Sequence, residues 1–142
     1  MANTVGLEII TPSKSFYKGD VEMVIVDTLD GEEGFLPKHE WATILLGVGE
    51  MWLKEPDADG FKAAAIAGGF IDVKDSIIIY TDAAEWKEDI DTARAEKAKA
   101  EAEAWLNSKP LAERDPDEIA RAEVALAKAI SRLKVSQSSF RD

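Results

Sequence analysis

The sequence predicts an α+β fold in sequence order: an N-terminal β-sandwich or flattened barrel, then a C-terminal antiparallel hairpin of two helices. Two observations support this prediction. Up to about residue 84, short apolar or alternating runs are separated by turn-forming residues every few positions. From residue 85 onward glycine is absent, alanine is frequent and helix-capping patterns replace the turns. We therefore expect a sandwich domain over residues 1–85 and a helical hairpin domain over residues 86–142.

The predicted strands follow one another closely. In the first, Val5, Leu7 and Ile9 share one parity, which is strand periodicity. The run 45–53 is apolar on both parities and carries two glycines, as in a buried strand that bends. A glycine pair at 68–69 permits either a close approach of two backbones or a β-bulge. Strands are expected at about residues 5–10, 16–20, 21–26, 45–53, 61–67, 70–73 and 76–80.

Two helices are predicted after the strands, at about residues 90–106 and 116–134. Asp89 is placed to cap the first helix, with Asp91 in its first turn. Asp115 caps the second helix and is followed by proline at the first helical position. Both patterns are typical of helix starts.

The facing stripes of the two helices are apolar but thin. A buried methylene contributes only about 0.8 kcal/mol, so each alanine adds little. We therefore expect the hairpin to dock weakly and to be able to detach, with a permanently packed hairpin as the alternative. The stripes are Ala95, Ala98, Ala102 and Trp105 on the first helix, and Ile119, Ala122, Leu126, Ile130 and Leu133 on the second.

Composition narrows the classes of function. Hydrophobic residues make up 46% of the chain, enough for a packed core. No apolar run approaches the roughly 20 residues of a membrane-spanning helix. The start of the chain lacks signal-peptide features and cysteine is absent, so we expect an intracellular protein. The net charge of −11 is concentrated in residues 1–84. This acidity disfavours nucleic acid and suits basic protein partners, unless it serves solubility alone.

Catalysis and metal binding find little support in the sequence. His39 is the single histidine and there is no cysteine, so neither thiol chemistry nor a histidine-based metal site can be assembled. The phosphate-binding pattern G-x-x-x-x-G-K-[ST] does not occur. Asp30, Glu32 and Glu33 could form an acid–base pair, but carboxylates in a turn are usually solvated. We expect a non-enzymatic protein with no metal and no required cofactor.

The most distinctive stretch is GEEGFLPKH at residues 31–39. Two glycines three positions apart permit a tight reversal, and Pro37 stiffens the exit from it. We expect a rigid acidic loop mounted on an apolar body. Such loops usually carry contacts rather than catalysis.

Four segments, in the right order, resemble the ε subunit of the F-type ATP synthase. They are the loop at 31–39 with the apolar run that follows it, AIAGGFIDV at 65–73, SIIIYTDAA at 76–84, and the two-helix hairpin. One residue departs from the family pattern: Trp41 stands where members usually carry proline.

The resemblance implies a non-catalytic rotor subunit in the central stalk of a proton- or sodium-translocating ATP synthase. The sandwich would bind the γ subunit and rest on the c-ring, with Glu32, Lys38 and His39 facing the ring. The helices would extend along γ into the αβ catalytic head and inhibit ATP hydrolysis. A peripheral position on the cytoplasmic face of the cell membrane is also implied, with membrane contact only through the complex.

Charged residues converge in the predicted hairpin. Asp91 and Arg94 are three apart near the start of the first helix, and Lys128 and Arg132 are four apart near the end of the second. These ends are adjacent in an antiparallel hairpin. The cations and the carboxylate could therefore hold a nucleotide. An interhelical ion-pair network is the alternative.

The resemblance implies which nucleotide this would be. Some ε subunits bind ATP through an I/L-D-x-x-R-A motif, matched here from Ile90 onward (IDTARA), and through two basic residues on the second helix, matched by Lys128 and Arg132. Glu85 falls at an acidic position of the pattern. Glu101 stands at a basic position, a charge reversal that should weaken phosphate binding. Regulatory ATP is therefore the expected ligand.

The rival function is a free-standing sandwich module that binds a small ligand such as a sugar. Trp41 and Trp52 would form its stacking platform. This function leaves the capped helical hairpin without a role.

Overall fold

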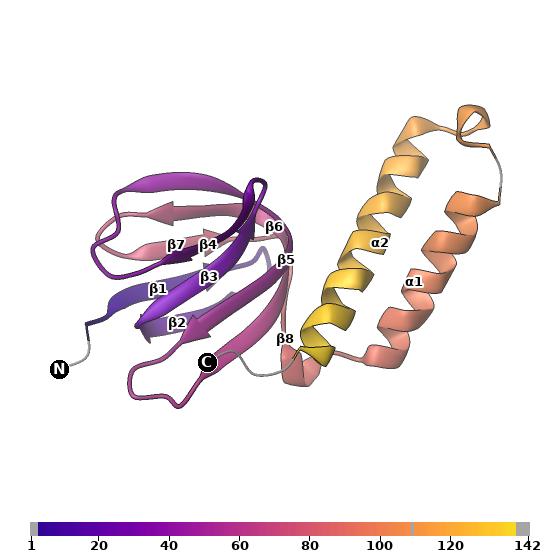
Figure 1. Cartoon of the computed structure of the whole chain (residues 1–142). Coiled ribbons are helices and arrows are strands. Elements are labelled where there is room, and N and C mark those ends of the chain that lie inside the picture. Colours follow the sequence, from indigo (N-terminus) through magenta and orange to yellow (C-terminus); the bar gives the residue numbers. More distant parts are fainter. Residues whose placement is uncertain (1–2, 109, 139–142) are drawn as a thin grey trace.

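The computed structural model describes residues 3–108 and 110–138, which form a β-sandwich with a two-helix hairpin against one side (Figure 1). The predicted fold, a strand-rich part followed by two antiparallel helices, is confirmed. The outer ends of the two predicted domains, at 1–2 and 139–142, lie outside the described residues.

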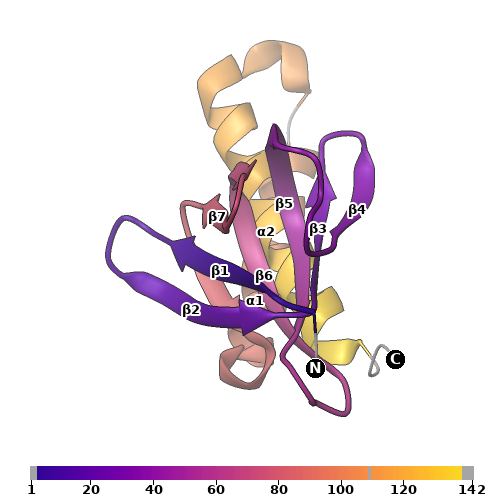
Figure 2. The same cartoon turned by 90° about the vertical axis from the view of Figure 1, so that its left-hand side faces the viewer.

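Eight strands of the described chain belong to one continuous sheet that folds over on itself. Their order is β2-β1-β7-β6-β5-β3-β4, and β8 pairs with β6. The β1–β2 and β3–β4 pairs lie on opposite sides of β5 and β6 (Figure 2). The strands are β1 (Val5–Ile10), β2 (Ser15–Val21), β3 (Met23–Thr28), β4 (Gly31–Phe35), β5 (Ala42–Lys54), β6 (Phe61–Val73), β7 (Ile77–Tyr80) and β8 (Ala84–Trp86).

The strand β6 is continuous through the glycine pair, where two separate strands were predicted. Gly68 and Gly69 have φ angles of 74° and 104°, and a Cβ on Gly69 would overlap the carbonyl oxygen of Tyr80. On one side of the pair β6 bonds to β8, and on the other to β7. The close backbone approach is therefore confirmed, and only glycine fits at position 69.

In both long strands, β5 and β6, the face that is buried switches to the opposite side of the strand at the glycines. In β5, Leu46 is buried on one side of the glycines and Met51 on the other, five residues apart; in β6, Ile66 and Ile71 are related in the same way. An odd spacing moves the side chain to the opposite face of a strand. This change explains why the run 45–53 is apolar on both parities.

The segment 31–39 is only partly a loop, which corrects the prediction. Residues 31–35 form β4, because Glu32 and Glu33 pair with Asp27 and Val26 of β3. The remaining loop runs from 36 to 41, between β4 and β5. Glu32 therefore lies on an edge strand.

The helices are α1 (Thr92–Asn107) and α2 (Pro116–Gln137), preceded by the short 3-10 turns η1 (Lys87–Asp89) and η2 (Leu111–Glu113). The predicted cap Asp89 is wrong, because the chain is still extended at Ile90. Asp91 is the N-cap instead, and its Oδ1 accepts a hydrogen bond of 3.1 Å from the Arg94 amide. The predicted cap Asp115 is confirmed and accepts from the Asp117 amide at 2.9 Å.

Two apolar clusters hold the structure together. The larger one fills the sandwich, with Ile9, Phe35 and Met51 fully buried. The smaller one lies between the sandwich and the hairpin. It consists of Ile25, Trp52, Ala63 and Ala65 from the strands together with Val135 of α2.

Candidate functional site

Two pockets occur where the hairpin meets the sandwich. The first has a volume of about 320 Å³ and collects the predicted charged residues from β8, α1 and α2. It is lined by Glu85, Asp91, Arg94, Ala95, Ala98 and Arg132. Four of the six predicted ATP-binding residues therefore line one pocket.

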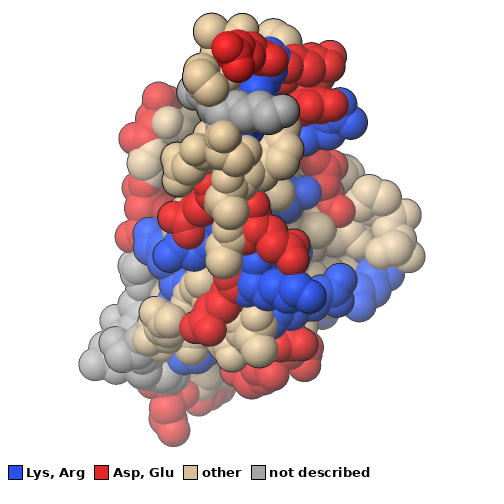
Figure 3. All heavy atoms as spheres, turned by 90° about the vertical axis from the view of Figure 1, so that its right-hand side faces the viewer, with Lys and Arg blue, Asp and Glu red and all other residues tan. Residues whose placement is uncertain are grey.

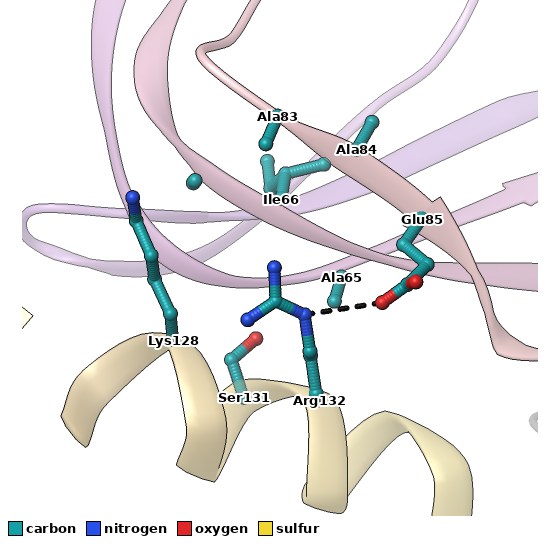
Figure 4. Close-up of a pocket in the computed structure, with 9 residues that line it drawn as sticks. Ala65, Ile66, Ala83, Ala84, Glu85, Lys128, Ser131 and Arg132 are labelled. Carbon is teal, nitrogen blue, oxygen red and sulfur yellow. Dashed lines mark hydrogen bonds and ion pairs between the residues drawn. The ribbon is translucent and has the colours of Figure 1, made fainter. Parts of the chain in front are cut away.

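The second pocket adjoins the first and has a volume of about 110 Å³ (Figure 4). Lys128, Ser131 and Arg132 reach toward β6 and β8 from one face of α2. Glu85 and Arg132 line both pockets, so they separate the two spaces. Lys128 thus stands beside the predicted site, on the side of α2 that faces the sandwich.

An ion pair lies at the centre of this region. The Nε of Arg132 donates a hydrogen bond of 3.1 Å to Glu85 Oε1, and both side chains are 36% exposed. Such a half-exposed pair contributes about 1 kcal/mol or less. Among the described residues, Arg94 and Lys128 form no ion pair within 4.0 Å. The pair joins hairpin to sandwich, so among the described residues it is not part of the ion-pair network between the two helices that was the alternative to nucleotide binding.

The first pocket has the chemistry of an anion site. It lies at the N-terminus of α1, where backbone N–H groups and the helix dipole favour negative charge. Arg94 and Arg132 add two guanidinium groups from different helices. The Asp91 carboxylate is engaged by its own helix cap. The lining therefore combines two guanidinium groups with the carboxylates of Glu85 and Asp91.

Besides Lys128, two residues of the predicted ATP pattern are outside the first pocket. Ile90 packs against the apolar cluster of Trp52 and Val135, so its role here is packing. Glu101 is exposed on α1 and does not line the pocket.

The face of α2 that docks on the sandwich was missed from the sequence. Ser131 Oγ donates to the Gly49 carbonyl oxygen at 2.9 Å, and Lys87 Nζ donates to the Ser138 carbonyl oxygen at 2.6 Å. Val135 is fully buried beside them. The sequence does contain a pattern that indicates this face. Lys128, Ser131 and Val135 are spaced three and four apart and form a second helical stripe next to the predicted apolar one.

The stacking platform predicted from Trp41 and Trp52 is not formed. Trp41 is 68% exposed in the loop before β5, whereas Trp52 is 4% exposed beneath α2. A ring buried against Val135 cannot stack on a free ligand.

In the loop between β4 and β5, the His39 ring is held by its neighbours. Its Nδ1 is 2.7 Å from the Glu40 carbonyl oxygen, its Nε2 is 4.0 Å from Glu33 Oε1, and its centroid is 4.7 Å from that of Phe35. Lys38 is exposed with a positive φ of 67°. The structure therefore puts Lys38 and His39 in the same turn, with Glu32 on the adjoining strand.

Apolar side chains on neighbouring strands of the sandwich form an exposed row that the sequence did not reveal. Leu29, Leu45, Phe70 and Tyr80 are neighbours across successive strands, and we call them the apolar row. Leu29 and Leu45 are 66% and 61% exposed, and the Phe70 and Tyr80 rings stack with centroids 4.7 Å apart. Exposed apolar groups that gather on a surface are typical of an interaction site.

Two family descriptions match the chain in order. Residues 4–87 match the beta-sandwich domain of the ATP synthase, Delta/Epsilon chain, and residues 88–137 match its long alpha-helix domain. The chain belongs to the ATP synthase Delta/Epsilon chain family.

Relatives span nearly the same length. The ATP synthase epsilon chain of Alkaliphilus metalliredigens is 45% identical over 139 residues, covering 97% of this chain and 99% of the relative. That of Caldicellulosiruptor bescii is 39% identical over 135 residues, covering 94% and 93%. A chain in the structure of the Euglena gracilis mitochondrial ATP synthase superposes with a TM-score of 0.80 at 24% identity, covering 96% of this chain and 82% of that chain. This likeness supports the fold.

Neither α1 nor α2, as far as they are described, is long and apolar enough to cross a membrane. Over residues 3–108 and 110–138, no three His, Cys, Asp or Glu side chains gather as metal ligands.

Proposed function

We propose that this chain is a non-catalytic rotor subunit of the central stalk in a proton- or sodium-translocating F-type ATP synthase, where it couples γ to the c-ring. Membership of the Delta/Epsilon family supports this function. A structural neighbour at 13% identity and a TM-score of 0.67 comes from the Tetrahymena thermophila mitochondrial ATP synthase central stalk and c-ring. In this function the protein is peripheral on the cytoplasmic face of the cell membrane and reaches the membrane only through the complex.

The apolar row is the observation that carries this proposal. Large apolar side chains exposed together on a sheet favour a stable partner, because burying them removes apolar surface from water. Acidic residues outnumber basic ones in the sandwich sequence, which suits a partner with basic groups around an apolar patch. The γ subunit is the partner we assign to this surface.

The test is assembly with γ. Leu45→Asp and Phe70→Asp should each abolish co-purification with γ, because a carboxylate would be buried in the interface. Leu36→Asp is the matched control, since Leu36 is 54% exposed in the loop between β4 and β5 and does not belong to the row. Circular dichroism checks that all three variants remain folded. Undiminished binding by both row variants would exclude this surface as the γ interface.

The second contact we propose is between the c-ring and the segment that carries Glu32, Lys38 and His39. The exposed charges of Glu32 and Lys38 suit polar loops. Replacing Glu32 and His39 by alanine should weaken attachment of the head and stalk to the membrane while leaving γ binding intact. Normal attachment of the double variant would remove this segment from the ring contact.

The third element of the proposal is inhibition of ATP hydrolysis by the helices. The contacts of α2 with the sandwich that are described above lie in its C-terminal part, from Lys128 onward, and at its C-cap Ser138. Acidic and basic side chains are interleaved over the face seen in Figure 3. An extended hairpin would therefore present charges of both signs to γ and to the αβ head. Regulatory ATP in the pocket of Arg94 and Arg132 would bridge the two helices and favour the docked form.

A further inference from the structure

The turn between α1 and α2 is closed by one side chain, Arg114. Its guanidinium carbon lies 4.2 Å from the centroid of the Trp105 ring, a cation–π contact. Its Nη1 donates to the Trp105 carbonyl oxygen, and its Nη2 donates to Ser108 Oγ at 2.6 Å. Arg114 precedes α2, whereas Trp105 and Ser108 are at the end of α1. Arg114 therefore contacts a side chain, a backbone carbonyl group and the C-cap residue at the end of α1.

The end of α1 needs this contact. The last turn of α1 contains no basic residue to balance the negative end of the helix dipole. The Ser108 Oγ donates a hydrogen bond of 3.0 Å to the Trp105 carbonyl oxygen. Arg114 supplies a positive charge from across the turn. It lies next to the C-terminal end of α1, where a cation stabilises a helix.

The rest of the interhelical seam is weak. The buried side chains that α1 contributes are Ala95 and Ala102, which remove little apolar surface from water. The buried residues of α2 are Ala129, Ser131, Leu133 and Val135, of which Ser131 and Val135 contact the sandwich. At the end of the hairpin far from the sandwich, the Arg114 contact is therefore the strongest specific link that we identify between the helices.

We propose that Arg114 and Trp105 form a lock that keeps α1 and α2 together, so that a hairpin leaving the sandwich moves as one body until this lock opens. The lock is a property of the hairpin alone. Its consequence rests on the proposed function: inhibition that requires separated helices needs two openings in series, first of the α2–sandwich contact and then of the lock.

Hydrogen exchange of the full chain tests the lock. In Arg114→Ala, amides of residues 103–107 should exchange at least about tenfold faster, because a cation–π contact and two charged hydrogen bonds are lost. Amides of β6 and β7 should not change. Arg114→Lys keeps the charge but loses the planar stacking and the paired donors, so its exchange should lie between that of the unaltered chain and that of the alanine variant. Arg121→Ala is the control, because within the described residues Arg121 bonds to the Asp117 carbonyl oxygen of its own helix and not to α1.

Unchanged exchange at 103–107, or an equal acceleration over the whole chain, would overturn the lock. A second readout is ATP hydrolysis by the assembled synthase, which should fall in Arg114→Ala relative to Arg121→Ala. Faster local exchange without a fall in hydrolysis would leave the lock standing and would count against inhibition by separated helices.

Discussion

Ser131 of α2 and Gly49 of β5 are joined by a buried hydrogen bond of 2.9 Å from Oγ to the carbonyl oxygen. The contact lies where β5 changes its buried face. Position 49 must be glycine here, because a Cβ would lie 2.8 Å from the Cβ of Asp27. Asp27 Oδ2 in turn accepts from the Glu50 amide at 2.9 Å. The hairpin is therefore docked on a tightly constrained part of the sandwich.

Removing the Ser131 hydroxyl should loosen the hairpin. Ser131→Ala leaves the Gly49 carbonyl oxygen without this donor in a buried place, which costs about 1 kcal/mol and corresponds to roughly fivefold faster local opening. Hydrogen exchange of residues 131–137 measures it. Ser136→Ala is the matched control, because the Ser136 hydroxyl bonds within its own helix to Leu133. Equal exchange in both variants would contradict a docking role.

ATP should stabilise the docked hairpin. Ligand bound between Arg94 and Arg132 stabilises the chain by roughly 1–3 kcal/mol when its concentration exceeds Kd by about ten- to hundredfold. Thermal melts of the full chain with and without millimolar ATP measure the shift. Arg94→Ala and Arg132→Ala should abolish it, whereas Arg121→Ala should retain it. An unchanged melting temperature of the unaltered chain in ATP would contradict ATP binding at this pocket.

Gly69→Ala should be far more destabilising than Gly31→Ala. Both glycines have a positive φ, 104° and 119°, so both substitutions strain the backbone. A Cβ at position 69 would also overlap the Tyr80 carbonyl oxygen, whereas nothing lies within 4 Å of one at position 31. We expect a loss of about 1 kcal/mol for Gly31→Ala and several kcal/mol for Gly69→Ala in urea unfolding. Similar losses would refute the close-approach argument.

Tyr17 should make stability fall in alkali. Burial, together with the hydrogen bond of 3.1 Å that it donates to Glu55, raises the pKa of Tyr17 from about 10 to about 12. A folded-state pKa above the unfolded value adds stability below pH 10, and this stability is lost as pH rises through 12. Tyr17→Phe keeps the ring against Trp86 and removes the ionisation. The unaltered chain should therefore lose stability faster than Tyr17→Phe between pH 10 and 12, as followed by urea unfolding at each pH.

We propose that the sandwich folds without the helices and that its boundary follows Trp86. The Trp86 ring stacks on Phe16 at 4.5 Å, so β8 belongs to the sandwich. A chain ending at Asp89 should melt cooperatively but expose Trp52, which binding of a hydrophobic dye would detect. A chain ending at Ala83 lacks Trp86 and should be less stable by about 2 kcal/mol. A non-cooperative melt of the longer chain would refute the boundary.

Much of the architecture was predictable because it is local. Alternation of side chains gives strands, and capping residues such as Asp115 fix helix starts within a few positions. The same reasoning erred at Asp89 and in the segment that begins at Gly31. In both places the outcome depends on neighbours: the extended backbone at Ile90 delays α1, and pairing with β3 turns 31–35 into β4.

The candidate nucleotide site was predictable only in part. Helical spacing brings Asp91 to Arg94, and the antiparallel hairpin brings both toward Arg132. That Lys128 faces the sandwich, and that Ile90 packs against Trp52, depends on how α2 is rotated against β5 and β6.

By itself, the sequence determined the order of strands and helices, the capping of α2, the glycine pair of β6 and the family to which the chain belongs. The tertiary structure decided which face of α2 docks, that Trp52 is buried, that Arg114 closes the hairpin turn, and that the apolar row is left exposed. The physical reason is the range of the interactions. Periodicity and capping act over a few residues, whereas burial and cross-strand contacts join residues whose proximity depends on the whole packed chain.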